Sequence, residues 1–209
     1  MTVQLSDHMT WNGKSYTLTS RQPAPLFHPE SIGITPRSFG SLCWCGFTAS
    51  YEIKDKQLYV SSLRIGLDPK NFKSPPTING VAPHKFNGGT YLGHYYEDIW
   101  LPVTYSGKLL LGHQWVGNLG RGHHGYASTV EFEEVQSCVF EKGFLVSATD
   151  VSEQHAAEQA KLIAEENKRV EAQLVIEARQ QRRRNLINKV KLFFTRKKPT
   201  TADDDDCFL

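Results

Sequence analysis

The chain has 209 residues and a formal net charge of +2, with 39% hydrophobic and 11% aromatic residues. This composition excludes a disordered chain, and the length suits one domain with an appendage better than two full cores. Four scattered cysteines exclude a disulfide scaffold, and no apolar run approaches the about 18 residues that a membrane-spanning helix requires.

The charges are strongly segregated along the chain. Residues 1–150 carry twelve acidic and twelve basic side chains, and residues 151–181 carry six acids and four bases. Residues 182–198 carry eight bases and no acid, and the run Asp203–Asp206 follows them. This asymmetry indicates that electrostatic binding of a partner is concentrated near the C-terminal end.

The first half of the chain has the pattern of short strands and turns. Asn12-Gly13 lies between β-forming residues and predicts a hairpin, and the Pro-rich stretch 22–36 predicts irregular structure. Residues 47–53 alternate between apolar and polar side chains, and residues 58–63 return after a short turn, which predicts a second hairpin.

Further strands are predicted in the second half, after a long loop at residues 66–90. The predicted segments are 95–103 and 108–115, paired across Ser106-Gly107, then 126–132, 136–140 and 144–146. With no helical pattern between them, these strands predict an antiparallel sheet, as a sandwich or partly open barrel.

A long helix is predicted after this β-rich part. Thr149, Asp150 and Ser152 offer capping side chains, and residues 151–194 contain neither Gly nor Pro. The fold class is therefore α+β, with a β-rich domain at 1–149, a charged helix at 150–195 and a disordered acidic tail at 196–209. A weak 4-3 spacing of small and apolar residues suits helix docking or a homo-oligomeric coiled coil; its members are Ala156, Ala160, Ile163, Val170 and Leu174.

The end of this helix is predicted to be amphipathic and basic. Five apolar residues share one face at helical spacing, namely Leu186, Ile187, Val190, Phe193 and Phe194. Eight cations surround them, namely Arg182, Arg183, Arg184, Lys189, Lys191, Arg196, Lys197 and Lys198. The pattern is typical of binding to an anionic membrane surface. Nucleic acid, a groove-shaped protein partner, or packing back on the β domain are the alternatives.

A second group of candidate residues lies in and near the glycine-dense segment 117–125. Arg121, His123 and His124, together with His113, could form a hydrolytic or phosphate-handling site if the fold brings them together. Cys43-x-Cys45 in a strand would place both thiols on one face, but no second ligand pair accompanies them. No metal or cofactor is therefore expected.

Two segments resemble a group of small, uncharacterised bacterial and phage-associated β-rich proteins. The first is Trp44–Ile53 with the return Leu58-Tyr59-Val60, and the second is His124–Ser128 followed by Glu131. The chain departs from that group at Cys45, where Arg is usual, and at Phe47, where Tyr is usual. The resemblance implies a bacterial or phage source and a shared β fold, and it carries no catalytic residue across.

Together these features predict a non-enzymatic accessory protein. Its β domain would bind a partner, and its basic helix would associate with the cytoplasmic membrane surface or another subunit. The polar residues 1–10 do not resemble a signal peptide, so a cytoplasmic location is expected. The alternatives are a small hydrolase or phosphate-handling enzyme and a nucleic-acid-associated factor.

Overall fold

A computed structural model describes residues 4–38, 40–68, 75–88, 91–117 and 126–195. The chain divides into two compact units between Leu162 and Ile163. The first unit contains all the strands and the start of the long helix, and the second contains the rest of that helix.

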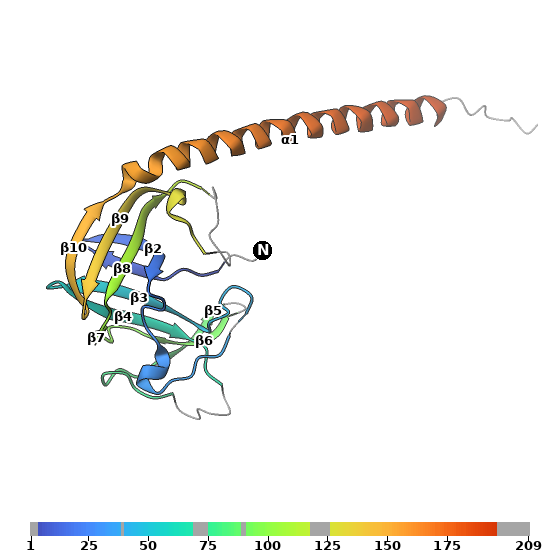
Figure 1. Ribbon diagram of the computed structural model, residues 1–209. Helices are drawn as coiled ribbons and strands as arrows, with labels where there is room; N and C mark the ends of the chain where they lie inside the picture. The colour runs from blue at the N-terminus through green and yellow to red at the C-terminus, as the bar shows by residue number, and fades with distance from the viewer. Residues whose placement is uncertain (1–3, 39, 69–74, 89–90, 118–125, 196–209) are drawn as a thin grey trace, which may run out of the picture. The chain divides into compact units, whose positions relative to one another are not determined.

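The elements follow one another in a simple order. They are β1 (His8–Trp11), β2 (Lys14–Gln22), η1 (Pro29–Ile32), β3 (Phe47–Lys54), β4 (Gln57–Ile65), β5 (His84–Gly88), β6 (Tyr91–Tyr96), β7 (Leu101–Pro102), β8 (Gly107–Trp115), η3 (Thr129–Glu131), β9 (Phe132–Glu141), β10 (Phe144–Asp150) and α1 (Ser152–Thr195). The predicted α+β class, a β-rich part followed by one long helix, is confirmed (Figure 1).

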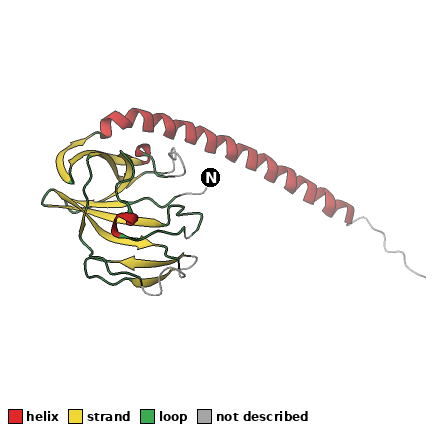
Figure 2. Ribbon diagram, turned by 60° about the horizontal axis from the view of Figure 1, so that its bottom comes forward, coloured by secondary structure: helices red, strands yellow, loops and turns green. Residues whose placement is uncertain are grey.

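Seven strands form a closed barrel in the order β10-β9-β8-β2-β1-β3-β4. The barrel closes where β10 pairs with β4 at Phe144 and Gln57, and the N–H of Leu145 donates to the carbonyl of Lys56 at 2.8 Å. The β5–β6 hairpin extends the sheet beyond β4, and β7 also pairs with β4. Figure 2 shows these strands in yellow. The sheet is antiparallel except that β1 and β3 run parallel.

The two hairpins predicted in the first half are confirmed. Asn12 and Gly13 have φ angles of 49° and 74°, the left-handed conformation that a two-residue hairpin turn requires. Asp55 and Lys56 adopt the same conformation between β3 and β4, with φ angles of 50° and 64°. In both cases the local sequence contains the turn and the strands that it joins.

Three predictions in the second half are wrong. Strand β8 pairs with β2 and β9 and does not form a hairpin with the segment before it. Residues 126–131 contain η3 where a strand was expected, and the expected loop at 66–90 contains β5. The alternation of apolar residues identifies a strand, but it does not identify its partner when that partner is distant in the chain.

The barrel interior is filled by apolar side chains from strands on all sides. Side chains with an exposed fraction of 1% or less include Met9, Ala49, Tyr51, Leu58, Val60, Leu63, Ile65, Leu109, Leu111 and Cys138. Burial of this many large side chains is the main source of stability for a fold of this kind.

The first turns of α1 are attached to the barrel. Asp150 accepts a hydrogen bond from the N–H of Ser152 at 2.9 Å, and the Ser152 hydroxyl accepts one from the N–H of Val135 at 2.9 Å. Gln159 donates to the carbonyls of Val130 and Phe132 at 3.1 and 2.9 Å. These contacts explain why the first unit extends beyond the predicted boundary at residue 149, as far as Leu162.

Candidate functional site

Two cysteines lie in a tight turn at residues 41–46, immediately before β3. The expectation that Cys43 and Cys45 belong to a strand is therefore wrong. Gly46 ends the turn with a φ angle of 78°, and a Cβ there would lie 2.5 Å from the backbone carbonyl carbon of Arg37. Glycine is required at this position both for its backbone conformation and for this close approach.

The cysteine turn, residues 41–46, is held by the N-terminal segment. Gln4 is only 3% exposed, and its side-chain amide donates to the carbonyl of Ser41 at 2.7 Å and accepts from the N–H of Trp44 at 3.2 Å. The N–H of Leu5 donates to the carbonyl of Leu42 at 2.9 Å. A turn fixed by several hydrogen bonds presents its side chains in one orientation.

The two thiols are close together but differ in exposure. Their sulfur atoms are 3.7 Å apart, and each lies within hydrogen-bonding distance of the carbonyl oxygen of Phe47, at 3.2 Å for Cys43 and 3.1 Å for Cys45. Cys43 is 2% exposed, whereas Cys45 is exposed. Solvent and small reagents therefore reach Cys45 first.

This arrangement separates the acidities of the two thiols. A hydrogen bond from the Cys43 thiol is the main reason that the pKa of Cys45 is lowered to about 6. The Phe47 backbone and the Tyr126 hydroxyl contribute in the same direction, while burial and the nearby charge of Asp7 oppose them. The same sulfur–sulfur hydrogen bond, followed by burial, raises the pKa of Cys43. The negative charge therefore resides on the exposed sulfur, which is the more nucleophilic form.

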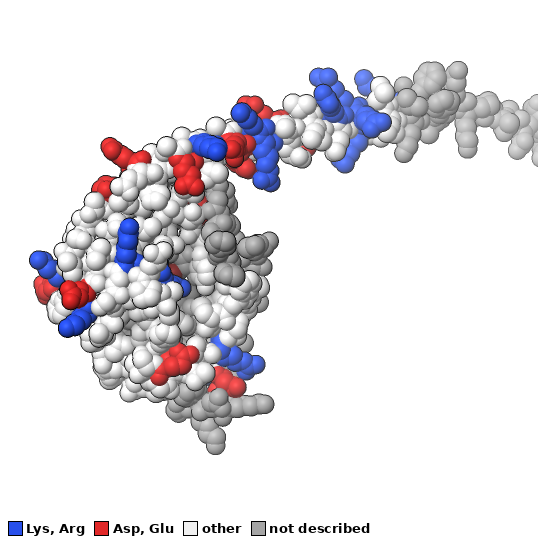
Figure 3. Space-filling model, viewed as in Figure 1, with Lys and Arg blue, Asp and Glu red and all other residues white. Residues whose placement is uncertain are grey.

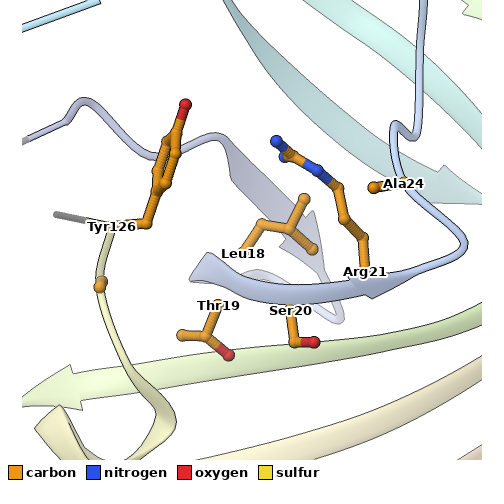
Figure 4. A pocket seen from close by; sticks show the side chains of 7 residues that line it. Leu18, Thr19, Ser20, Arg21, Ala24 and Tyr126 are labelled. Carbon is orange, nitrogen blue, oxygen red and sulfur yellow. The ribbon is translucent and has the colours of Figure 1, made fainter. Parts of the chain in front are cut away.

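Cys45 lines a pocket of about 260 Å³ together with Asp7, Arg21 and Tyr126. Arg21 and Tyr126 also line a neighbouring pocket of about 360 Å³, in which Figure 4 shows their side chains projecting into the same space from β2 and from the segment before η3. The Arg21 guanidinium lies 6.0 Å from the centre of the Tyr126 ring. These two side chains therefore form a shared wall between the pockets.

A partly buried ion pair supports this wall. Asp7 accepts hydrogen bonds from Arg21 at 3.0 Å and from the N–H of Ala49 at 2.9 Å, and the side chains of Asp7 and Arg21 are 11% and 29% exposed. Burial raises the pKa of Asp7, although both hydrogen bonds and the Arg21 charge act against that rise. Removal of Arg21 would therefore leave a costly isolated carboxylate.

The predicted catalytic group is described only in part. Arg121, His123 and His124 lie outside the described residues. His113 lies on β8, where its Nδ1 is 2.8 Å from the carbonyl of Ser15 and its ring contacts Tyr16 at a centroid distance of 5.3 Å. These contacts give His113 a packing role between β8 and β2.

The predicted membrane-binding group begins in the described part of α1. Arg182, Arg183, Arg184 and Lys189 are exposed, and Leu186 and Ile187 are 65% and 53% exposed. In Figure 3 the basic side chains gather towards the C-terminal end of the described part of this helix. The side chains of Val190, Lys191, Phe193 and Phe194 are outside the description, as are residues Arg196, Lys197 and Lys198, although helical backbone continues to Thr195.

No sequence pattern predicts that Asp7, Arg21 and Tyr126 lie together beside Cys45. These residues come from three separate segments, and no spacing connects them. Two local features of the sequence point to this site. They are the Cys43-x-Cys45 spacing and the position of Tyr126 in the second segment of the resemblance. In that segment Ser128 and Glu131 form a capping box at η3, which is a structural role. Among the described residues, no three His, Cys, Asp or Glu side chains gather as a metal site would require.

Comparison with known proteins gives no match to a family model, a curated protein or a solved structure.

Proposed function

We propose that this chain is an accessory protein that attaches its β-barrel unit to the anionic cytoplasmic surface of a membrane through the C-terminal end of α1. The observation that carries the proposal is the combination of clustered cations with exposed aliphatic side chains on a continuous helix. Only Asn185 separates Arg182, Arg183 and Arg184 from Leu186 and Ile187, and the last acidic residue of the helix is Glu177.

The C-terminal part of α1 has exposed aliphatic side chains. A single helix has no core of its own, so exposed side chains such as Leu186 and Ile187 are stabilised only by another surface. A basic amphipathic helix can place its apolar face at the boundary between lipid headgroups and acyl chains. Each Lys or Arg near an anionic surface then contributes about 1 kcal/mol. The helical backbone continues to Thr195, which supports extending this face beyond the described side chains.

The mode of attachment would be interfacial. In the described part of the chain, no helix is long and apolar enough to cross a membrane. A mixed helix with cations beside aliphatic residues suits the surface of a bilayer and not its interior.

Nucleic acid is a weaker candidate partner for two reasons. The first 150 residues carry equal numbers of acidic and basic side chains, so the barrel unit adds no net attraction to phosphate. A helix bound to phosphates through its cations would also leave Leu186 and Ile187 in water. The membrane surface accommodates both kinds of side chain.

Co-sedimentation with lipid vesicles tests the proposal. We expect the full-length protein to sediment with anionic vesicles at low salt, to sediment less at moderate salt, and to remain in the supernatant with neutral vesicles. A chain truncated after Gln181 keeps the whole barrel unit and should not sediment under any of these conditions. Equal recovery of the two chains would contradict the proposal.

A further inference from the structure

We propose that Cys43 and Cys45 form a redox-active dithiol. It reduces small disulfides, or the disulfide bonds of short peptides, placed in the adjoining pocket. This inference goes beyond membrane attachment and does not depend on it, because the residues lining the pocket all belong to the barrel unit. It rests on two sulfur atoms 3.7 Å apart, of which one is exposed and the other buried, beside a pocket of about 260 Å³.

The difference in exposure determines the order of events. Cys45 is exposed and lines the pocket, so its sulfur is the one that a substrate disulfide can approach. Cys43 is 2% exposed, and its sulfur lies 3.7 Å from that of Cys45. An accessible nucleophilic thiol beside a shielded second thiol is the arrangement that thiol–disulfide exchange requires.

The reaction balances as two successive exchanges. The Cys45 thiolate attacks one sulfur of the substrate disulfide, forms a mixed disulfide and releases the other substrate sulfur as a thiolate. The Cys43 thiol then gives its proton to that released thiolate or to water and attacks the sulfur of Cys45. The second substrate thiolate leaves and takes up a proton from water. Two electrons pass from the dithiol to the substrate, which becomes two thiols, and Cys43 and Cys45 become a disulfide. A low-molecular-weight thiol restores the dithiol by the reverse chemistry.

The second exchange requires the two sulfur atoms to come into bonding distance. They are 3.7 Å apart in the dithiol, and a disulfide needs about 2.05 Å, so the two sulfur atoms must approach each other during the reaction. Oxidation removes the Cys43 thiol hydrogen and with it the hydrogen bond to the Cys45 sulfur. Since this hydrogen bond stabilises only the reduced pair, it makes the Cys43–Cys45 disulfide more easily reduced than a structural disulfide.

The walls of the pocket indicate the class of substrate. Apolar side chains on one side include Phe27 and Phe47, whose rings meet edge to face at 6.3 Å, together with Pro25 and Pro36. Arg21 is already paired with Asp7, so this cation is not available to an acidic ligand. A pocket of this size suits a cysteine with one apolar neighbour better than a folded protein.

A trapping experiment with the full-length protein tests the assignment. The protein carries Cys207→Ser, so that the three described cysteines remain, and is reduced and mixed with either oxidised glutathione or the disulfide of N-acetyl-Phe-Cys-amide. After cleavage at Arg37 and Lys54, the mass of peptide 38–54, which contains both cysteines, shows their state. We expect this peptide to lose two hydrogens in the parent chain. In Cys43→Ser the same peptide should gain one substrate thiol on Cys45, because no thiol remains to resolve the mixed disulfide. The apolar disulfide should react several-fold faster than glutathione, and buried Cys138 serves as the unreactive internal control.

The pH dependence of alkylation separates this site from two thiols that merely lie close together. The groups that face the Cys45 sulfur are Cys43, Tyr126, Asp7 and the Phe47 backbone, and Arg21, His28 and Glu30 also line the pocket. Alkylation of Cys45 should reach half its maximal rate near pH 6, and Cys43→Ala and Tyr126→Phe should move that midpoint to higher pH. If the midpoint rises by about one pH unit, the rate at pH 6 falls about fivefold.

Three results would overturn the proposal. They are a parent chain that remains a dithiol with both disulfides, a Cys43→Ser variant that accumulates no more mixed disulfide than the parent, and a Cys45 midpoint near that of an ordinary thiol. Cys45→Ser changes an exposed side chain, so it should fold like the parent and lose both reactions. A Cys45→Ser chain that still reacts at Cys43 would also contradict the assigned order.

Discussion

Replacement of Arg182, Arg183 and Arg184 by glutamine lowers the affinity of the full-length protein for anionic vesicles by about 100-fold. Each cation contributes about 1 kcal/mol near an anionic surface, and about 1.4 kcal/mol corresponds to a factor of ten in affinity. Glutamine keeps the helix propensity and most of the side-chain length, so the loss reports on charge. The measurement is a vesicle titration at low salt, monitored by sedimentation.

The matched control removes three cations from another part of the same helix. Lys161, Lys168 and Arg169 lie in the segment where acids outnumber bases, and Arg169 is paired with Glu166 at 3.5 Å. We expect the variant with glutamine at these three positions to lose less than fivefold in affinity. Equal losses in the two variants would mean that total charge, and not the end of α1, determines binding.

Replacement of Arg21 by methionine destabilises the barrel by about 3 kcal/mol at neutral pH. The change leaves the Asp7 carboxylate 11% exposed and without its cation, and loss of one member of a buried ion pair costs about 3–5 kcal/mol. The cost lies at the lower end of this range because the Arg21 side chain is itself 29% exposed. The free energy of unfolding in urea, monitored by tryptophan fluorescence, measures the effect.

The destabilisation caused by Arg21→Met should depend on pH through the Asp7 carboxyl group. The pKa of Asp7 is already raised in the folded protein, and loss of the Arg21 charge raises it further. An ionised carboxylate with a raised pKa costs stability above that pKa, and the cost disappears as the pH falls through it. The Arg21→Met defect should therefore become smaller in acid. A defect that is the same at pH 7 and pH 5 would contradict this account.

An exposed ion pair in the same barrel provides the control. Lys14 contacts Glu134 at 2.7 Å, but the Lys14 side chain is 49% exposed. Lys14→Met should cost less than about 1 kcal/mol, as exposed ion pairs usually do.

The double variant Asp7→Asn with Arg21→Met should recover part of the stability lost in Arg21→Met, since it no longer buries an unpaired charge.

The parts of the fold that were predicted correctly are those specified by neighbouring residues. Asn12-Gly13 supplies the left-handed turn of the first hairpin. In β3 the alternation of apolar and polar residues places Ala49 and Tyr51 on the buried face of the strand. The helix follows from a segment without Gly or Pro. Each of these signals is local, so the sequence alone is sufficient to identify it.

Barrel closure and the pairing of β8 could not be predicted in the same way. The closing contact joins Phe144 to Gln57, and β8 pairs with β2 and β9, so both depend on strands far apart in the chain. Many pairings bury a given set of alternating apolar residues equally well, and the packing of the whole barrel selects among them.

The candidate site was only half visible in the sequence for a related reason. The spacing of Cys43 and Cys45 is local, but their different exposure depends on Gln4, Gly46 and the segment around Arg37. Tyr126 lines the same pocket as Cys45 but comes from the segment before η3. Prediction of such a site requires the three-dimensional arrangement of segments that the sequence does not connect.

Hydrogen exchange of the full-length protein, with and without anionic vesicles, tests the proposed membrane attachment most directly. A solvated single helix opens easily, so backbone amides of residues 182–195 should exchange quickly in solution and several-fold more slowly with vesicles. Peptides from residues 163–177 and from the barrel strands should change little, and neutral vesicles should have no effect. Unchanged exchange at residues 182–195, or slowed exchange confined to the barrel, would contradict the account.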